Sequence, residues 1–375
     1  MAGIYIHIPF CKQACHYCDF HFSTNLGRRS EMVHAISKEL EMQKKYLHRE
    51  KVNTIYLGGG TPSLLTQDEL LAVLNSVHQN FDIAFESEVT LEANPDDLNE
   101  YQLRDLKEVG VNRLSIGVQS FHDPHLTYMN RAHNAKLAEY CIPLARRAGF
   151  DNISIDLIYA LPSDDHLIWK KDLQKAISLC PDHISSYCLT IEDKTAFGTW
   201  QKQGKIRVMN DDFAAEQYEL MVATLKPAGY IQYEISNFCL PGKESRHNGN
   251  YWKQEPYLGI GPGAHSFDGA SRQFNLPHNQ KYVESITAEE IPAEKEVLSQ
   301  VDQINEYILT RLRTVWGCNL DQLKALHNYD LWHKQNKTLA VLSKQGLIEV
   351  DPHQLKLTDR GKLLADQIST DLFVT

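Results

Sequence analysis

Three cysteines lie within eight residues near the start of the chain, and their spacing is Cys11-x3-Cys15-x2-Cys18. A loop with this spacing can bring three thiolates onto one inorganic centre, and iron–sulfur clusters are commonly held by such thiolates. A complete [4Fe–4S] set has four cysteine ligands, so three would leave one iron open to another molecule. Zinc with His16 or His21 as a fourth ligand is an alternative, and a third interpretation is three neighbouring buried thiols.

The other five cysteines are scattered, at positions 141, 180, 188, 239 and 318. A disulfide framework would spread all its cysteines, so the tight cluster favours reduced, metal-binding thiolates. The segment from Met1 to Cys11 shows no basic leader or small-residue cleavage site, and no apolar run is long enough to cross a bilayer. We therefore expect a cytoplasmic protein.

Composition limits the possible classes of function. The chain has 375 residues, of which 42% are hydrophobic and 23% charged, and its formal net charge is −10. These values are typical of a globular protein with a sizeable core and exclude a disordered or collagen-like chain. The acidic balance argues against a broad nucleic-acid surface, so tRNA modification is disfavoured and no nucleic-acid partner is expected.

Strand-like and helix-like segments alternate through the first half of the chain. Short β-branched runs predict strands at residues 4–8, 54–57, 88–92, 113–117, 153–158 and 183–189. Apolar residues at three- and four-residue spacing predict helices at residues 29–46, 67–79, 99–109, 135–148 and 167–179. Six β–α units require parallel strands with right-handed crossovers, which suits a doubly wound sheet or a TIM-like barrel.

Polar residues gather toward the carboxyl ends of these strands, as they do at the active face of a barrel. They are the cysteine loop, the run Gly58-Gly-Gly-Thr-Pro62, Glu92, Asn94, Gln119 and Asp156. Each is weak alone, since a tight β–α turn or a solvated strand end explains it equally well. Their shared position favours a partial (β/α)6 barrel of the α/β class, with its functional mouth where the strands end.

The pattern changes after about Thr190. A helix is expected at residues 211–226, followed by a loop carrying His247 and a Gly-rich run, Gly259–Ser266. From residue 301 onward, helices at 307–315, 320–325 and 330–345 precede a hairpin of 347–350 against 354–357, which resembles a winged helix. This part has nine basic and nine acidic residues, so it favours packing or protein contact over DNA. We expect three parts: 1–190, 191–300 and 301–375.

The run Tyr5-Ile-His-Ile-Pro-Phe-Cys11, the three cysteines and Gly-Gly-Gly-Thr-Pro together resemble the radical S-adenosylmethionine superfamily. Within it, the match from Tyr5 to about Ser266 resembles the group of oxygen-independent coproporphyrinogen III oxidases and HemW heme chaperones. The resemblance implies a [4Fe–4S] cluster on Cys11, Cys15 and Cys18. The amino and carboxylate groups of S-adenosylmethionine would occupy the open iron, and the reduced cluster would cleave this molecule to a 5′-deoxyadenosyl radical.

The resemblance also implies an S-adenosylmethionine pocket. Its residues would be Tyr5, Gly60, Thr61, Pro62, Glu92, Gln119, Arg131 and Asp156, with Tyr17 packing on the cofactor beside the cluster. Carboxylates can accept hydrogen bonds from the ribose or the amine, and an arginine can meet a carboxylate bidentately. On this interpretation Arg131 would pair with the carboxylate of S-adenosylmethionine.

Two departures favour the heme chaperones over the oxidases. The oxidases carry a further cysteine two residues after the third ligand, where this chain has Phe20, and they have a long extension before the first strand. The segment His247-Asn-x-x-Tyr251-Trp252 resembles a heme-binding signature. Histidine and tyrosine are known axial ligands of heme iron, and Trp252 could stack on the porphyrin; a satisfied core histidine with two core aromatics is the alternative.

The sequence thus predicts a heme chaperone that binds heme, a [4Fe–4S] cluster and S-adenosylmethionine and transfers heme to client hemoproteins. The alternative is a radical oxidoreductase acting on a tetrapyrrole, as an oxygen-independent coproporphyrinogen III dehydrogenase. Whether the chain is itself an enzyme stays open on this basis. So do peripheral contact with membrane hemoproteins and a homodimer.

Overall fold

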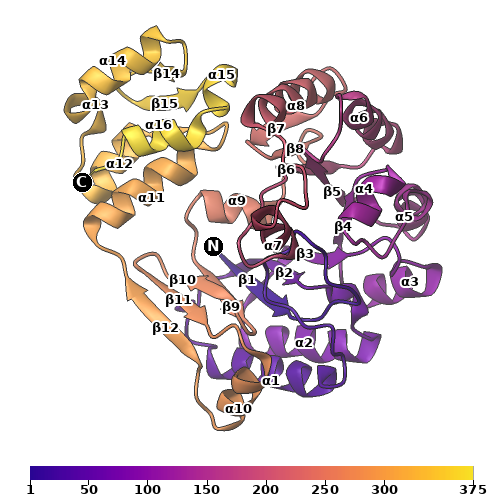
Figure 1. Ribbon diagram of the computed structural model, residues 1–375. Helices are drawn as coiled ribbons and strands as arrows, with labels where there is room; N and C mark the ends of the chain where they lie inside the picture. Colours follow the sequence, from indigo (N-terminus) through magenta and orange to yellow (C-terminus); the bar gives the residue numbers. More distant parts are fainter. Residues whose placement is uncertain (375) are drawn as a thin grey trace.

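The computed structural model describes residues 1–374, and its centre is a sheet whose first six strands run parallel (Figure 1). These strands are β1 (Ala2–Ile8), β2 (Val52–Gly59), β3 (Ile83–Ala93), β4 (Arg113–Gln119), β5 (Ile153–Tyr159) and β6 (His183–Cys188). They are hydrogen-bonded in sequence order, with Ile4 beside Ile55 and Ile116 beside Ile155. All six predicted strands are therefore present, each within a few residues of its expected bounds.

Helices join successive strands and cover the outside of the sheet (Figure 1). They are α1 (Arg29–Met42), α2 (Gln67–Asn80), α3 (Glu100–Glu108), α4 (Asp123–Tyr128), α5 (Ala135–Arg147) and α6 (Leu167–Leu179). Thr66 and Glu69 form the capping box that starts α2. The helix predicted at 29–46 ends at Met42, and α4 was not predicted.

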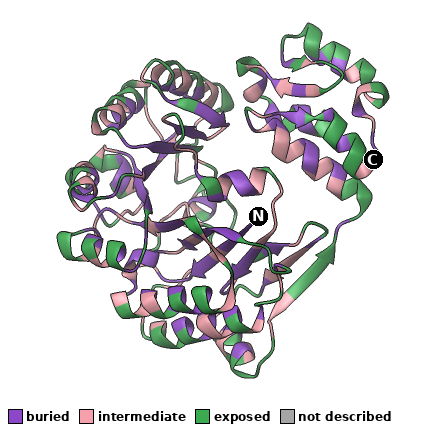
Figure 2. Ribbon diagram, turned by 180° about the vertical axis from the view of Figure 1, so that it is seen from behind, coloured by how far each residue is buried: buried purple, intermediate pink, exposed green. Residues whose placement is uncertain are grey.

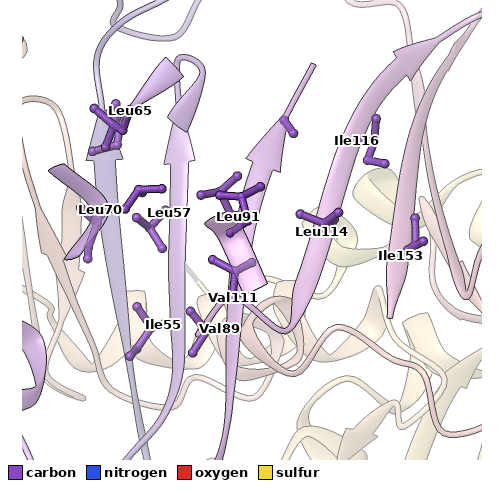
Figure 3. Close-up of a cluster of buried hydrophobic side chains, with 14 of the residues drawn as sticks. Ile55, Leu57, Leu65, Leu70, Val89, Leu91, Val111, Leu114, Ile116 and Ile153 are labelled. Atoms are coloured by element: carbon purple, nitrogen blue, oxygen red, sulfur yellow. The ribbon is translucent and has the colours of Figure 1, made fainter. Parts of the chain in front are cut away.

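Branched aliphatic side chains fill the space between this sheet and its helices. Leu57, Leu91 and Leu114 lie on successive strands and are fully buried (Figure 3). Figure 2 shows the same division, with buried strands and helices exposed on their outer faces. Parallel strands covered in this way read as continuous apolar runs, which is why the sequence identifies them readily.

The six-stranded barrel stays open, as predicted. The second neighbour of β1 is β9, and the second neighbour of β6 is β8, so β1 and β6 do not pair. The segment after β6 extends both edges through these elements: α7 (Ala196–Lys202), α8 (Asp211–Leu225), β7 (Ile231–Glu234), β8 (Asn237–Cys239), α9 (Arg246–Trp252), β9 (Tyr257–Ile260), β10 (His265–Phe267), β11 (Ser271–Asn275), α10 (Asn279–Thr287) and β12 (Ala293–Val297).

The C-terminal part has its own hydrophobic core and a three-stranded sheet. Its elements are α11 (Gln300–Leu312), β13 (Cys318–Asn319), α12 (Leu320–His327), α13 (Leu331–Lys334), α14 (Asn336–Lys344), β14 (Ile348–Val350), β15 (Gln354–Leu357), α15 (Asp359–Lys362) and α16 (Ala365–Asp371). The predicted hairpin is present. The helix predicted at 330–345 is wrong, because it breaks at Gln335, whose backbone leaves helical geometry.

None of the described helices is both long enough and apolar enough to cross a membrane.

A single buried carboxylate, Glu39, connects α1 to the segment that follows β6, which we call the extension. Its oxygens accept hydrogen bonds from the side chains of Gln43, Asn275 and Tyr282 and from the backbone N–H of Gly261. Burial raises the pKa of Glu39, although its four donors oppose this effect. The extension is thus fixed to the barrel by polar contacts as well as by packing.

We predict that Glu39→Ala lowers the free energy of unfolding by about 2–4 kcal/mol, because several buried donors lose their acceptor. Chemical denaturation measures this change. Glu41→Ala, on the exposed face of the same helix, is the control and should shift the free energy by less than about 0.5 kcal/mol. Equal effects of the two variants would contradict the role of Glu39.

Candidate functional site

The end of β2 holds the start of the cysteine loop in place. The backbone N–H of Gly60 donates to the carbonyl of Ile8 at 2.9 Å, and that of Thr61 donates to the carbonyl of Phe10 at 2.7 Å. A Cβ at Gly60 would lie 2.6 Å from the Phe10 oxygen, so the two segments can approach only because residue 60 is glycine. The Gly-Gly-Gly-Thr-Pro run therefore positions the residue directly before Cys11.

Two polar side chains reach the cysteine sulfurs. Thr61 Oγ1 donates to Cys11 Sγ at 3.5 Å, and Arg131 Nη1 donates to Cys15 Sγ at 3.2 Å. Burial raises the pKa of Cys11 to about 11 and that of Cys18 to about 12. All three thiols are free and partly exposed.

The three thiols can serve as the ligands of an iron–sulfur cluster. Within residues 1–374, no three His, Cys, Asp or Glu side chains are gathered around one point as one metal ion requires. In an iron–sulfur cluster each thiolate binds a different iron, so the sulfurs need not meet at one point. In the zinc alternative each histidine has one ring nitrogen with another partner: His16 Nδ1 lies 2.9 Å from the Tyr128 carbonyl, and His21 Nε2 lies 2.6 Å from Asn279 Oδ1.

The guanidinium of Arg131 is hydrogen-bonded to several residues of this mouth, so its terminal nitrogens are not free to pair with a carboxylate. Its Nη1 also donates to Tyr17 at 3.3 Å, and its Nη2 donates to Asn94 at 2.5 Å and to the Gly117 carbonyl at 2.8 Å. Asn94 in turn donates to Thr61 Oγ1 at 3.2 Å. Both terminal nitrogens are thus occupied, and only the buried Nε–H lacks a partner among the described residues. The bidentate contact expected for Arg131 is not available in this arrangement.

Two partly buried carboxylates lie deeper in the mouth. Glu92 accepts hydrogen bonds from Tyr56 at 2.7 Å and from the Gly59 N–H at 3.1 Å, and Asp156 accepts one from Ser115 at 3.3 Å. Burial raises the pKa of Glu92 to about 7 and that of Asp156 to about 6, and the Arg113 guanidinium opposes both shifts. These carboxylates take up a proton more readily than usual, and a bound cation would favour their charged forms.

Gln119 and Tyr5 complete the mouth. Gln119 ends β4 with a positive φ of 67°, and a Cβ at Gly117 would meet its amide nitrogen at 2.9 Å and the Arg131 side chain at 3.1 Å. The ring of Tyr5 stacks on Tyr56. Pro62 opens a short 3-10 turn, Pro62–Leu64, directly after the glycine run.

The structure thus places the predicted cluster and S-adenosylmethionine residues at one end of the barrel. Sequence reasoning gave no role to Tyr56 or Arg113, and it noted Asn94 only as a polar residue after a strand. Asn94 joins Arg131 to Thr61. The position of Asn94 two residues after Glu92 was the available signal. Tyr56 lies inside an apolar run and Arg113 is the first residue of β4, so neither position gave a signal.

The prediction that His247 lies in a loop is wrong. His247 belongs to α9, which Ser245 caps, and only 1% of its surface is exposed. Its Nδ1 lies 2.8 Å from Thr54 Oγ1 and its Nε2 lies 2.9 Å from the Tyr251 hydroxyl. A Cβ at Gly3 would meet the imidazole at 3.2 Å, so His247 lies where β1 begins, opposite the cysteine loop. Burial lowers its pKa to about 3.

Tyr251 and Trp252 border a cavity, and His247 does not. Both line a cavity of about 1010 Å³ that also receives Tyr5 and, from the end of the cysteine loop, Phe20. Trp252 packs beneath the Arg313 guanidinium, and its buried indole N–H has no partner among residues 1–374. The aromatic part of the predicted heme motif therefore borders a large cavity, and its histidine does not.

Comparison with known proteins agrees with this fold. Residues 5–170 match the Radical SAM superfamily, and residues 298–364 match the HemN C-terminal domain. Coproporphyrinogen III oxidase (HemN) from Escherichia coli, described as a radical SAM enzyme, matches with a TM-score of 0.86 at 22% identity over 100% of this chain and 90% of that one. The chain has the radical SAM fold.

Relatives that match nearly the full length of the chain identify its family within the radical SAM superfamily. The heme chaperone HemW of Bacillus subtilis is 34% identical over 98% of both chains, and that of Mycobacterium tuberculosis H37Rv is 36% identical over 98% of this chain and 93% of its own. A mitochondrial radical S-adenosyl methionine domain-containing protein 1 of Bos taurus is 32% identical over 99% and 87%. The chain belongs to the HemW family.

We predict that Cys11→Ala, Cys15→Ala and Cys18→Ala each abolish a reconstituted iron–sulfur cluster, because each removes one thiolate ligand. Iron and sulfide content after anaerobic reconstitution, with the visible absorption band, measures the outcome. Cys188→Ala removes an exposed thiol from the end of β6 and is the control. Retention of iron and sulfide in any of the three variants, or stoichiometric zinc in the wild type, would contradict the assignment.

A second prediction concerns pH. Glu92 has a pKa of about 7 in the fold against an ordinary 4.5, so between these values the folded protein keeps a proton that the unfolded chain has lost. Its contribution to stability is present at acidic pH and is lost as the pH rises through about 7. Glu92→Gln should flatten this part of the profile of unfolding free energy against pH. Glu86→Gln, exposed on the same strand, should leave the slope as in the wild type.

Proposed function

We propose that this chain is a heme chaperone that holds a [4Fe–4S] cluster, S-adenosylmethionine and heme, and delivers heme to client hemoproteins. The proposal is supported by full-length similarity to proteins named heme chaperone HemW. The observation that carries it is the cavity bordered by Tyr251, Trp252 and Phe20, which adjoins the cysteine loop and is large enough for a planar macrocycle.

At the barrel mouth, Cys11, Cys15 and Cys18 would hold the cluster, and Arg131 and Thr61 would orient two of these sulfurs. Glu92 and Asp156 can accept hydrogen bonds from the amine and the ribose of S-adenosylmethionine, with Gln119 and Gly60 closing the pocket. A cluster with S-adenosylmethionine bound supplies one-electron reductive chemistry. Because both carboxylates have a raised pKa, binding a cationic amine would release protons and would strengthen as the pH rises.

Phe20 is the residue that favours a chaperone over an oxidase. The oxidase pattern has a further cysteine at this position, and here the phenyl ring is 65% exposed and faces the cavity. An apolar ring at that place adds contact area for a flat hydrophobic ligand. A radical oxidoreductase acting on a tetrapyrrole is the second candidate, and the fold shared with coproporphyrinogen III oxidase favours it.

Four predictions about the setting belong to this proposal. They are a cytoplasmic location, client hemoproteins as partners, peripheral contact with those that lie in membranes, and a homodimer. The division at residues 190 and 300 is also part of it, with the C-terminal part contacting proteins in preference to nucleic acid.

The test is to offer anaerobically reconstituted protein heme and coproporphyrinogen III in separate reactions. A chaperone binds about one heme per chain and passes it to an apo-hemoprotein, and it produces no protoporphyrinogen IX. Absorption spectra measure the binding and the transfer, and chromatography measures the porphyrin products. Repeated turnover of coproporphyrinogen III without stoichiometric heme binding would contradict the chaperone function and favour the oxidoreductase.

A further inference from the structure

The cavity beside the barrel mouth has one wall made by the β10–β11 hairpin. His265 lies opposite Phe274 and Phe267 lies opposite Arg272 in the antiparallel register. Because side chains alternate along a strand, these four share one face of the hairpin, and all four line the cavity. Ser266 lies between His265 and Phe267 in the sequence and faces the opposite side of the hairpin. It is buried there, and its hydroxyl accepts a hydrogen bond from the Gly259 N–H at 2.9 Å.

The opposite walls come from α9, the cysteine loop and α11. Tyr251 and Trp252 extend from α9, Phe20 and His21 follow the last cysteine, and Glu306 and Thr310 belong to α11. The cavity therefore combines aromatic side chains on several sides with a few polar groups. Sites for flat, largely apolar ligands have this composition.

Three histidines line this cavity, and they differ in their free nitrogens. His7 is bonded through both, to the Tyr5 hydroxyl at 3.1 Å and to the His21 carbonyl at 2.8 Å. His21 is bonded to Asn279 through Nε2 alone, so only its Nδ1 is left without a partner among the described residues. The imidazole of His265 is exposed and makes no hydrogen bond within residues 1–374, so both its nitrogens are available. Partial burial and Arg272 lower the pKa of His265, which favours the neutral form that metals bind.

Arg272 adds a group that recognises carboxylates. Its Nη2 lies 2.9 Å from Glu306, and its Nε–H is buried without a partner among the described residues. An arginine has five N–H donors, so the contact to Glu306 leaves others for an anionic ligand. Arg272 lies two strand positions from the register partner of His265, on the same face of the hairpin.

We propose that the iron of bound heme is ligated by His265, that one heme propionate pairs with Arg272, and that His247 is a positioning residue. The inference rests on the proposed function, because it names the residues of the heme site. His247 is hydrogen-bonded to Thr54 through one ring nitrogen and to the Tyr251 hydroxyl through the other. It therefore fixes the position of the Tyr251 ring, which borders the cavity. Trp252 supplies an aromatic face beside it.

The experiment uses the reconstituted full-length protein titrated with heme. His265→Ala should shift the Soret maximum and weaken binding by more than about tenfold, because a ligand bond to iron is lost. In His265→Gly, added imidazole should restore the wild-type spectrum. His34→Ala, an exposed histidine on α1, is the control and should match the wild type. His247→Gln should keep the wild-type Soret position even where its affinity falls, since its effect passes through Tyr251.

The outcomes separate this inference from the proposed function. A wild-type protein that binds no heme would overturn both. Heme binding by the wild type with an unchanged spectrum in His265→Ala, or a Soret shift in His247→Gln that imidazole reverses, would overturn the assignment of His265 alone.

The propionate contact is tested with heme dimethyl ester, which has no free carboxylates. The wild type should bind heme about tenfold more tightly than the ester, and Arg272→Gln should remove most of this preference. An equal preference in the variant would overturn the pairing. Circular dichroism of each variant confirms that it folds.

Discussion

The site depends on the close approach of two backbone segments at the barrel mouth. Gly60 and Thr61 donate to Ile8 and Phe10, which fixes the chain directly before the first cysteine. A side chain at position 60 would separate them, since its Cβ would lie within 3 Å of three backbone atoms. The cysteine loop is thereby tied to β2, and its geometry is set by the sheet.

A second feature of the barrel interior is a group of charged side chains, of which Arg113 is buried and Glu92 and Asp156 are partly buried. Glu92, Asp156 and Arg113 lie among apolar strands, and the electrostatic effect of Arg113 extends to both carboxylates. Arg113 is 1% exposed, and its Nε has no partner among the described residues. Such groups are costly to bury unless they serve a ligand or each other. Their place behind the cysteine loop therefore supports a binding role.

The sequence predicted the barrel well because buried parallel strands are continuous apolar runs and their helices have clear periodicity. It pointed to Glu92 and Gln119 through the ends of β3 and β4, and to Asp156 as an acidic residue within the apolar run of β5. It failed at His247, since a short helix with Gly249 and two asparagines has the composition of a loop, and tertiary packing decides its conformation. The hairpin face of His265 and Arg272 depends on a strand register that no local pattern specifies.

On the proposed function, one chain holds the cluster and heme together in adjoining sites. Electron paramagnetic resonance of the reduced cluster, freed of excess reductant and recorded before and after one equivalent of ferric heme is bound, measures this, with samples carrying only one centre as references. We predict that both centres bind in the same molecule and that the cluster signal disappears as the cluster passes its electron to the ferric heme, because Phe20 and His21 connect Cys18 to the heme cavity. Heme that binds only when the cluster is absent, or a cluster signal that persists beside a bound and still ferric heme, would contradict the account.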